Sequence, residues 1–242
     1  MENTSYIAMS RQAALRRSMD IVANNIANAN TPAFKAERMM FQEYLAKPTK
    51  DDKLSFVEDI GTARDLSSGP LTTTGNDFDV ALSDEGYFVV DSPLGERYTR
   101  HGRFQLDANG QLVTGTGYPV QGQAGPINIP EDGGRISIAG DGTISNDEGI
   151  LGKLQVVTFE DEQKLRKAAN GLFIADPDVD PQQVAQPSMM QGMIEGSNVQ
   201  AVLELTRMMD INRAHESVAK LIQREDDRIK DMIDKLGRAP QG

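Results

Sequence analysis

Two acidic loops that contain glycine are the best candidates in this sequence for metal chemistry. Asp107-Ala108-Asn109-Gly110 resembles the start of a calcium-binding loop, in which carboxylate and amide oxygens at alternate positions surround the ion. The glycine comes two positions too early, however, and no glutamate completes the twelve-residue pattern. Residues 140–149 could hold a cation weakly, but tight turns between strands explain the same residues. We therefore expect no metal site.

Acid–base and nucleotide chemistry have little support either. The chain has two histidines, His101 and His215, and neither has a matching constellation in the sequence. Residues 115–120 break the dinucleotide fingerprint at Val120, and no phosphate loop or nucleophile elbow is present. The absence of cysteine excludes disulfides and thiolate metal sites. We expect no enzyme, no catalytic residue, no cofactor and no small-molecule substrate.

Four aromatic residues offer one alternative, a glycan-binding β module. Tyr87, Phe88, Tyr98 and Tyr118 could line a sugar-binding groove. Aromatic residues on strands more often belong to the core. Arg100 and Arg103 are expected to pair with acidic neighbours in solvent rather than to bind a substrate.

The middle of the chain reads as a compact antiparallel β domain over residues 69–175. Sixteen of the 22 glycines lie between Gly69 and Gly152 and separate short apolar or alternating runs, a spacing typical of strands and turns. The turns are predicted at residues 92–95 and 107–110, with one helical turn near residues 161–167. The predicted strands are residues 78–82, 87–90, 97–100, 103–106, 111–114, 127–129, 135–138 and 154–159.

The first thirty residues predict an amphipathic helix. Its apolar positions alternate in spacings of four and three, as in a coiled-coil seam. They are Ala8, Leu15, Met19, Val22 and Ile26, with Gln12 completing the series. Pro32 disfavours helix at Thr31, so the helix is expected to end there, with Asn30 as its cap.

Three asparagines, Asn24, Asn25 and Asn28, precede that end and need a second explanation. A buried amide must find both donors and acceptors, and a misaligned one costs about 1–3 kcal/mol. We therefore expect these amides to fix the axial register between packed helices.

A second and longer helix is predicted at the other end of the chain. Ser197 or Asn198 could cap it and Gly237 could stop it, which gives a length of about 60 Å. Its predicted seam keeps a strict alternation of three and four residues. The seam comprises Leu205, Met208, Asn212, His215, Ala219, Ile222, Asp226, Ile229, Ile233 and Leu236.

Charge is distributed unevenly along the 242 residues. The net charge is −11, yet residues 1–45 and 197–242 are nearly neutral and the middle carries −12. Neutral helices can pack against copies of themselves without long-range repulsion. No basic stripe is available for nucleic acid. No secretory signal peptide is recognisable, and no stretch approaches the ~18 apolar residues that would cross a bilayer.

Four segments, in order and with matching spacing, resemble the axial proteins of the bacterial flagellum, the basal-body rod and hook family. The segments are residues 23–35, 79–82 with 86–90, 98–104, and 191–192 with 195–199. The proximal rod type is the nearest, and a distal rod or hook subunit is the alternative. Three positions depart from the family pattern: Ala33 stands where glycine is usual, His215 where an aromatic is common and Val218 where asparagine is frequent.

The resemblance implies a rod subunit that assembles through its terminal helices and transmits motor torque. It implies other rod subunits and the flagellar export apparatus as partners, export without a cleaved signal, and a place in the basal-body rod within the periplasmic space. The helices would form an inner coiled-coil domain and the β domain an outer shell.

The expected fold class is thus α+β, with a discontinuous helical coiled-coil domain and a central antiparallel β domain. The expected segments are 1–45 (helical domain), 46–68 (polar linker), 69–175 (β domain), 176–196 (return linker) and 197–242 (helical domain). The expected subunit interface consists of Leu15, Met19, Val22, Asn24, Asn25, Ile26, Asn28, Leu205, Met208, Asn212, His215, Ile222, Ile229, Ile233 and Leu236.

Overall fold

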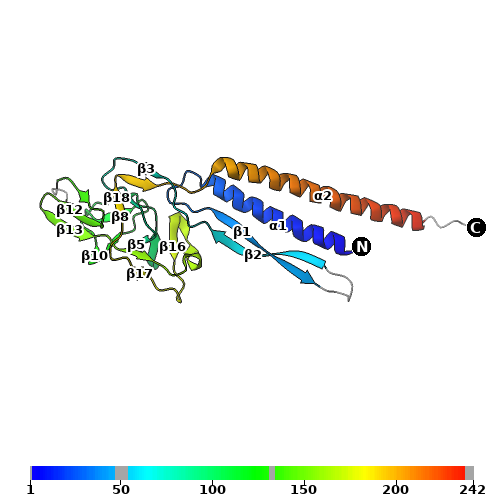
Figure 1. Ribbon diagram of the computed structural model, residues 1–242, viewed down its shortest axis with the longest axis horizontal. Helices are drawn as coiled ribbons and strands as arrows, with labels where there is room; N and C mark the ends of the chain where they lie inside the picture. Colours follow the sequence, from blue (N-terminus) through cyan, green and yellow to red (C-terminus); the bar gives the residue numbers. More distant parts are fainter. Residues whose placement is uncertain (1, 47–53, 131–133, 238–242) are drawn as a thin grey trace, which may run out of the picture. The chain divides into compact units, whose positions relative to one another are not determined.

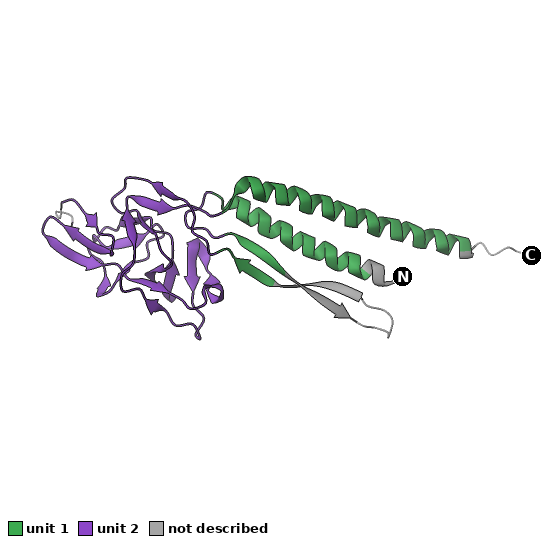
Figure 2. Cartoon of the chain, in the orientation of Figure 1, with its two compact units in different colours: residues 1–29, 36–65, 199–242 green, residues 30–35, 66–198 purple. Residues whose placement is uncertain are grey.

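The computed structural model describes residues 2–46, 54–130 and 134–237, and within them it leaves out the side chains of residues 2–5, 41–46, 54–60, 236 and 237. The chain divides into two compact units (Figure 2). We call residues 1–29, 36–65 and 199–242 the helical unit, and residues 30–35 and 66–198 the β unit. The predicted α+β class is confirmed.

The helical unit is built from two antiparallel helices and a β-hairpin. Helix α1 spans Glu2–Ala27 and helix α2 spans Ala201–Gly237. The two helices lie side by side, and the hairpin lies along α1 (Figure 1). Two chain segments about 170 residues apart in sequence therefore share one unit.

The hairpin occupies part of the segment that was expected to be a polar linker. Strand β1, Glu37–Ala46, pairs antiparallel with β2, Leu54–Arg64, and the register shifts between Met40 and Phe41. Residues 54–64 are thus a strand and not a tether. The acidic residues of this segment obscured its strand pattern. In the partner strand, Met39, Phe41 and Leu45 lie two and four positions apart, which agrees with the two-residue period of a strand.

Two predicted helix caps are not confirmed. Helix α1 ends at Ala27, and the left-handed residue that follows is Ala33, with φ of 56°, rather than Asn30. Helix α2 begins at Ala201 and not at Ser197 or Asn198. Instead, Asn198 uses its side-chain amide to donate a 2.9 Å hydrogen bond to the Ser67 carbonyl. The left-handed backbone at Ala33 is one that glycine would adopt more readily than alanine.

The β unit is a set of short antiparallel strands around one larger sheet. The large sheet has the order β15-β16-β6-β5-β14-β17. Its strands are β5 Tyr87–Ser92, β6 Gly95–Thr99, β14 Val156–Thr158, β15 Arg166–Lys167, β16 Leu172–Ile174 and β17 Gln182–Gln183. The other strands are β3 Leu71–Thr73, β4 Val80–Leu82, β7 Phe104–Leu106, β8 Leu112–Thr114, β9 Gln121–Gly122, β10 Gly125–Pro126, β11 Ser137–Ile138, β12 Thr143–Asn146, β13 Gly149–Lys153, β18 Met189–Gln191 and β19 Met193–Glu195.

Strand β5 separates two apolar cores. Phe88 and Val90 face one core, and Tyr87 and Val89 face the other, because successive side chains of a strand point to opposite sides. Phe88 packs edge-on against Phe104, with ring centroids 5.1 Å apart. The β unit therefore has a dense interior on both faces of its central strand.

Most of the predicted strands and both predicted hairpin turns are present. Ser92 pairs with Gly95 across the first turn, and Asp107 accepts hydrogen bonds from the backbones of Asn109 and Gln111 in the second. The predicted helical turn is the 3-10 helix Glu162–Lys164, and a second spans Ala169–Gly171. Residues 127–129 form no strand, only an isolated bridge at Asn128.

The expected return linker, which is rich in proline, contains strands. Residues 176–196 contain β17, β18 and β19, where we expected a linker. Strand β18 pairs with β4 and β19 pairs with β3. Backbone pairing with strands far away in the sequence holds this segment, and such pairing leaves no local pattern.

Candidate functional site

The two acidic loops close turns. Asp107 accepts hydrogen bonds from the backbone nitrogens of Asn109 and Gln111, both at 2.8 Å. Asp141 accepts from the Thr143 backbone nitrogen at 3.1 Å, from Lys153 Nζ at 3.1 Å and from the Thr143 hydroxyl at 3.0 Å. These bonds lower the pKa of both carboxyls. Among the described residues, no group of three or more acidic or histidine side chains is arranged to hold a metal ion.

The two histidines lie in different units and have different surroundings. His215 of α2 lies beside α1, with its Nε2 atom 3.3 Å from Gln12 Nε2. His101 is half-buried in the β unit, and burial followed by the charge of Arg103 lowers its pKa. The two rings are therefore not parts of one site.

The aromatic groove expected for a glycan is not formed. Tyr87, Phe88 and Tyr98 are all buried, and only Tyr118 is half-exposed. The three buried rings pack in the two cores of the β unit. Aromatic side chains need an open face to stack on a sugar, so these rings fill space instead.

Asn25 joins three elements of the helical unit. Its side chain is 1% exposed and makes two hydrogen bonds with the backbone of Glu37, one to the carbonyl at 2.8 Å and one from the nitrogen at 3.0 Å. Its amide also donates to Glu204 Oε2 of α2 at 3.3 Å. The side-chain amide thus pairs with the backbone of β1 as a neighbouring strand would, and it connects α1, β1 and α2.

The other two asparagines of the predicted register set are placed differently. Asn24 is exposed, and its backbone carbonyl accepts a 2.9 Å hydrogen bond from the Asn28 side chain. Asn28 is half-buried. Of the three asparagines, Asn25 is the most buried, and the role of the three in the register between packed helices stays a prediction.

The less exposed stripe of α2 only partly coincides with the predicted seam. Met208, His215, Ala219 and Ile222 belong to both. Glu204, Ile211 and Val218 also lie on the less exposed stripe but not on the predicted seam. Two alternating series of four and three overlap on this helix, and sequence alone did not show which of them faces α1.

The remaining predicted interface positions divide by exposure. On α1, Val22 is buried and Leu15, Met19 and Ile26 are half-buried. On α2, Leu205, Asn212, Ile229 and Ile233 are exposed. The side chain of Leu236 lies outside the described side chains.

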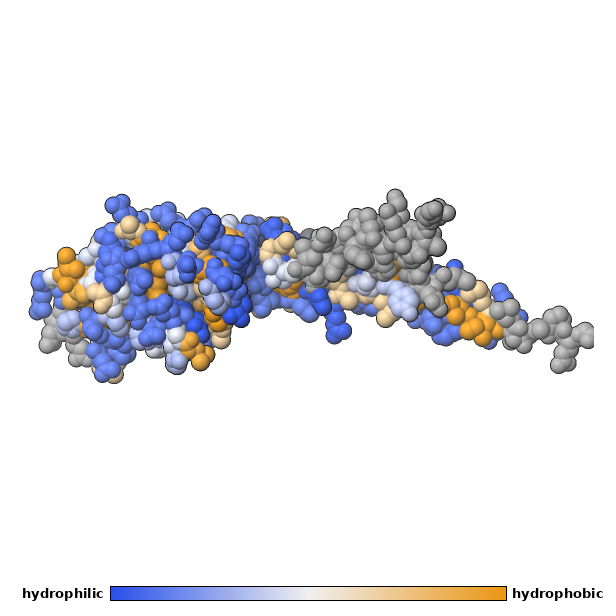
Figure 3. Space-filling model, turned by 90° about the horizontal axis from the view of Figure 1, so that it is seen from below, coloured by the Kyte–Doolittle hydropathy of each residue, from blue (hydrophilic) through white to orange (hydrophobic). Residues whose placement is uncertain are grey.

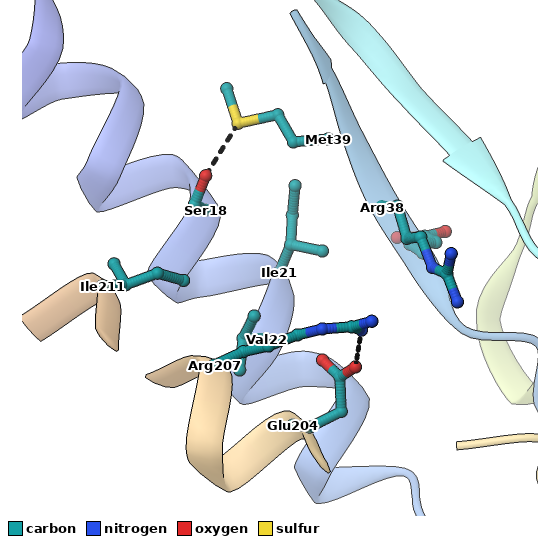
Figure 4. A pocket seen from close by; sticks show the side chains of 9 residues that line it. Ser18, Ile21, Val22, Arg38, Met39, Glu204, Arg207 and Ile211 are labelled. Carbon is teal, nitrogen blue, oxygen red and sulfur yellow. Dashed lines mark hydrogen bonds and ion pairs between the residues drawn. The ribbon is translucent and has the colours of Figure 1, made fainter. Parts of the chain in front are cut away.

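A hollow opens between α1, α2 and β1 in the helical unit (Figure 4). Its volume is about 300 Å³. Apolar side chains line it together with the charged pair Arg207 and Glu204, which are hydrogen-bonded. The lining residues are Ser18, Ile21, Val22, Glu37, Arg38, Met39, Glu204, Arg207 and Ile211. The packing of the three elements is therefore incomplete at this point.

Large apolar side chains remain exposed along the helical unit. The exposed set comprises Tyr6, Met9, Met40, Val202, Leu203, Leu205, Met209, Leu221, Ile229 and Ile233. Figure 3 shows apolar surface near the C-terminal end of α2. Exposed apolar side chains that form a contiguous patch can mark a surface that binds a partner. None of the described helices is long and apolar enough to span a membrane.

One prediction about the β unit is wrong. Arg100 is not a solvated side chain, because it is buried and its Nε atom donates a 2.6 Å hydrogen bond to Glu195 Oε2. Glu195 lies in a segment that was expected to be a linker. The ion pair thus joins two sequence motifs that are 95 residues apart.

Three sequence models of flagellar proteins match successive parts of the chain. The model described as "Flagella basal body rod protein" matches residues 6–35. The "Flagellar hook protein FlgE/F/G D1 domain" matches residues 81–146. The "Flagellar basal body rod FlgEFG protein C-terminal" matches residues 190–235. The first and last matches fall on the two helices, and the middle one falls on the β unit.

Whole-chain relatives carry the same description. The chain is 40% identical to the flagellar basal-body rod protein FlgF of Caulobacter vibrioides, over 98% of this chain and 99% of the relative. It is 34% identical to FlgF of Escherichia coli, over 94% and 95%. It is 30% identical to the rod protein FlgG of Bacillus subtilis, over 96% and 98%. The chain belongs to the flagellar basal-body rod protein family.

Proposed function

We propose that this protein is a structural subunit of the proximal part of the flagellar basal-body rod, and that it works by assembly without substrate turnover. The family and the basal-body location follow from relatives that align over nearly the whole chain. Among those named above, the two called FlgF are 40% and 34% identical to it, and the one called FlgG is 30% identical. This order favours the proximal type.

The exposed apolar residues of the helical unit are the observation that supports assembly through the helices. Leu205 and Met209 lie one turn apart on α2 and are 47% and 53% exposed. Ile233 near its other end is 63% exposed. Burying a Leu, Ile or Met side chain fully contributes roughly 1.5–3 kcal/mol. Several such contacts per neighbour would bind a subunit firmly.

The proposed interface therefore has an outer and an inner part. Leu205, Asn212, Ile229, Ile233 and Asn24 are exposed and would contact neighbouring subunits directly. The less exposed members of the predicted set would support the helix pair from within; they are Leu15, Met19, Val22, Asn25, Ile26, Asn28, Met208, His215 and Ile222. Leu236 is proposed for the outer part from its sequence position alone.

Torque transmission would follow from the stiffness of long helices packed on several neighbours. Each added neighbour buries more of the apolar surface that the single chain leaves in solvent. We propose further rod subunits as these neighbours. We also propose that the flagellar export apparatus delivers the chain to the periplasmic rod without cleaving a signal peptide.

Gene deletion with complementation tests the proposal. We expect a deletion strain that does not swim and lacks complete rods in electron micrographs, and a wild-type gene that restores both. The variant Leu205→Asp should fail to restore swimming while the purified chain keeps its β unit folded. A normally motile Leu205→Asp strain would contradict assembly through this face of α2.

Leu94→Asp is the matched control. Leu94 is 83% exposed in the turn between β5 and β6 of the β unit, so the same change of charge occurs away from the proposed interface. We expect this variant to swim. A rod lost equally with both variants would show that the charge itself, and not its place on α2, blocks assembly.

A distal rod subunit is the second candidate, because the FlgG relative aligns over 96% of the chain. The two candidates differ in which deletion strain the gene restores. We expect rescue of a strain that lacks FlgF and no rescue of one that lacks FlgG. The reverse result would assign the protein to the distal rod.

A further inference from the structure

Three charged side chains meet in the interior of the β unit, and we call Lys35, Arg100 and Glu195 the Glu195 cluster. Their side chains are 4%, 4% and 1% exposed. Glu195 Oε1 lies 2.8 Å from Lys35 Nζ, and Oε2 lies 2.6 Å from Arg100 Nε. Both oxygens of one buried carboxylate are thus used by cations from different parts of the chain.

The other hydrogen bonds of the cluster go mainly to backbone groups of nearby residues. Lys35 Nζ donates to the Ser67 carbonyl at 2.7 Å, and the Gly69 nitrogen donates to Glu195 Oε1 at 2.9 Å. Arg100 donates to the carbonyls of Gly86 and Asp84 at 3.1 and 2.9 Å, and to Ser68 Oγ at 3.3 Å. Two cations and one anion leave one excess positive charge, which these carbonyl oxygens partly offset.

The cluster connects the segments through which the chain enters and leaves the β unit. The chain passes from one unit to the other after residues 29, 35, 65 and 198. We call residues 30–35, 66–69 and 195–198 the crossing segments. Lys35 lies in the first, the backbone partners Ser67 and Gly69 lie in the second, and Glu195 lies in the third. Arg100 anchors all three to the end of β6.

Short backbone contacts reinforce the same connection. The Ala33 nitrogen donates to the Glu195 carbonyl at 2.9 Å, and the Gly196 nitrogen donates to the Pro70 carbonyl at 2.8 Å. A Cβ atom at Gly69 would overlap the carbonyl of Gly196. The second and third crossing segments therefore approach so closely that only glycine fits at position 69.

A buried ion cluster is a weak source of stability, because desolvation of the charges offsets most of their attraction. Well-packed apolar residues would give a similar or larger stability. The charged groups add directionality, because their hydrogen bonds form only when donors and acceptors are correctly placed. Removal of one partner leaves the other charges buried and uncompensated. The Glu195 cluster therefore specifies an arrangement more than it stabilises a fold.

We propose that Glu195 is the hub of a clamp that holds the three crossing segments in one arrangement on the β unit. Without its carboxylate the crossing segments separate from the rest of the β unit while the two apolar cores stay folded. The inference concerns the folded chain itself and holds whichever rod or hook subunit the protein is.

Hydrogen exchange of the purified chain tests the clamp. In Glu195→Gln we expect the peptides that contain Ala33, Gly69 and Gly196 to lose protection by on the order of a hundredfold. Peptides from β5 and β6 should keep theirs. Unchanged exchange in the crossing segments contradicts the proposal, and so does an equal loss in β5, which would show general destabilisation.

Lys35→Met distinguishes a hub from a simple sum of ion pairs. This variant keeps the Arg100–Glu195 pair, so we expect faster exchange around Ala33 and Ser67, which lose the contacts of Lys35, and unchanged exchange around Gly196. Release of all three segments by Lys35→Met would contradict the assignment of Glu195 as the hub, and this holds even if Glu195→Gln does not fold.

The double variant Glu195→Gln/Lys35→Met tests the charge argument. It has the same net charge in the cluster as the native chain, so we expect it to recover part of the protection that Glu195→Gln loses. A loss equal to the sum of the two single losses would contradict the argument. Asp176→Asn is the control, because it breaks an exposed pair with Arg166, and it should leave the crossing segments unchanged.

Discussion

The two units of this chain use their apolar residues in opposite ways. In the β unit the large side chains are inside: Phe88, Leu112 and Ile144 have no exposed surface. In the described part of the helical unit, the buried apolar residues are alanines and valines, such as Ala8, Val22 and Val218. Many of its large apolar residues, Leu205 and Ile233 among them, are exposed, and others are only half-buried. The β unit has closed apolar cores, whereas the helical unit leaves apolar residues exposed that the proposed assembly would cover.

The largest effect that this comparison predicts is on the core of the β unit. Phe88→Ala removes a fully buried ring that packs on Phe104, so it should lower the free energy of unfolding by about 3–5 kcal/mol. Leu205→Ala on α2 should change it by less than about 0.5 kcal/mol. Denaturant unfolding of the purified variants measures both. A large loss in Leu205→Ala would show that the helical unit already buries this residue.

The next largest effect concerns the asparagine that joins α1, β1 and α2. Asn25→Ala leaves the nitrogen and carbonyl of Glu37 without their side-chain partner, at a cost of about 1–3 kcal/mol. The helical signal in circular dichroism should therefore be lost at a lower temperature in this variant than in the native chain. Asn24→Ala is the control, since Asn24 is exposed. Equal losses in both variants would contradict the special role of Asn25.

Ala33→Gly should stabilise the β unit. Ala33 has φ of 56°, a left-handed conformation that costs a non-glycine residue about 1–2 kcal/mol. Glycine adopts it freely but loses more backbone entropy on folding, so we expect a net gain of less than about 1 kcal/mol. Thermal unfolding measures the gain. A lower melting temperature would mean that the methyl group makes contacts worth more than the strain.

The smallest effect is a change in the pH dependence of stability. Burial alone would raise the pKa of Glu195, but Arg100, Lys35 and the Gly69 nitrogen outweigh it and hold the pKa below 4.5. The folded chain then binds fewer protons than the unfolded chain, so this contribution is complete above pH 4.5 and is lost as the pH falls through the folded pKa.

Lys35 contributes at the other end of the pH range. Burial lowers the pKa of Lys35 below 10.5, although Glu195 opposes the change. Stability should therefore rise as the pH increases from the folded pKa of Lys35 towards 10.5. Thermal unfolding between pH 3 and 10 measures both contributions, and Glu195→Gln should flatten the acid side. An unchanged acid profile would show that other carboxyls, such as Asp107 and Asp141, account for it.

The sequence predicted the elements that carry a local pattern. The two helices, the strand around Tyr87, and the turns at residues 92–95 and 107–110 all follow from periodicity and from turn residues. It did not predict β18 or β19, because their pairing partners lie far away in the sequence. The partner of β19 is β3, about 120 residues earlier in the chain. It missed β2 for another reason: the partner β1 is the preceding strand, but acidic residues mask the apolar pattern of β2.

The candidate site was predicted in part for a similar reason. The polar character of the asparagines predicted a register function between packed helices, which stays a prediction. The structure shows that Asn25 joins α1, β1 and α2 within the chain. The predicted seam of α2 only partly coincides with the less exposed stripe, because two helical faces of this sequence carry similar apolar patterns. The Glu195 cluster could not be foreseen, since Lys35, Arg100 and Glu195 lie in three separate motifs that only the fold brings together.

Hydrogen exchange on the isolated native chain tests the central claim most directly. If the helical unit depends on neighbours, amides in the middle of α2 should exchange many times faster than those of β5, and assembly into rods should slow them. Equal protection of α2 and β5 in the single chain would contradict the account, because it would show that the helical unit is complete without partners.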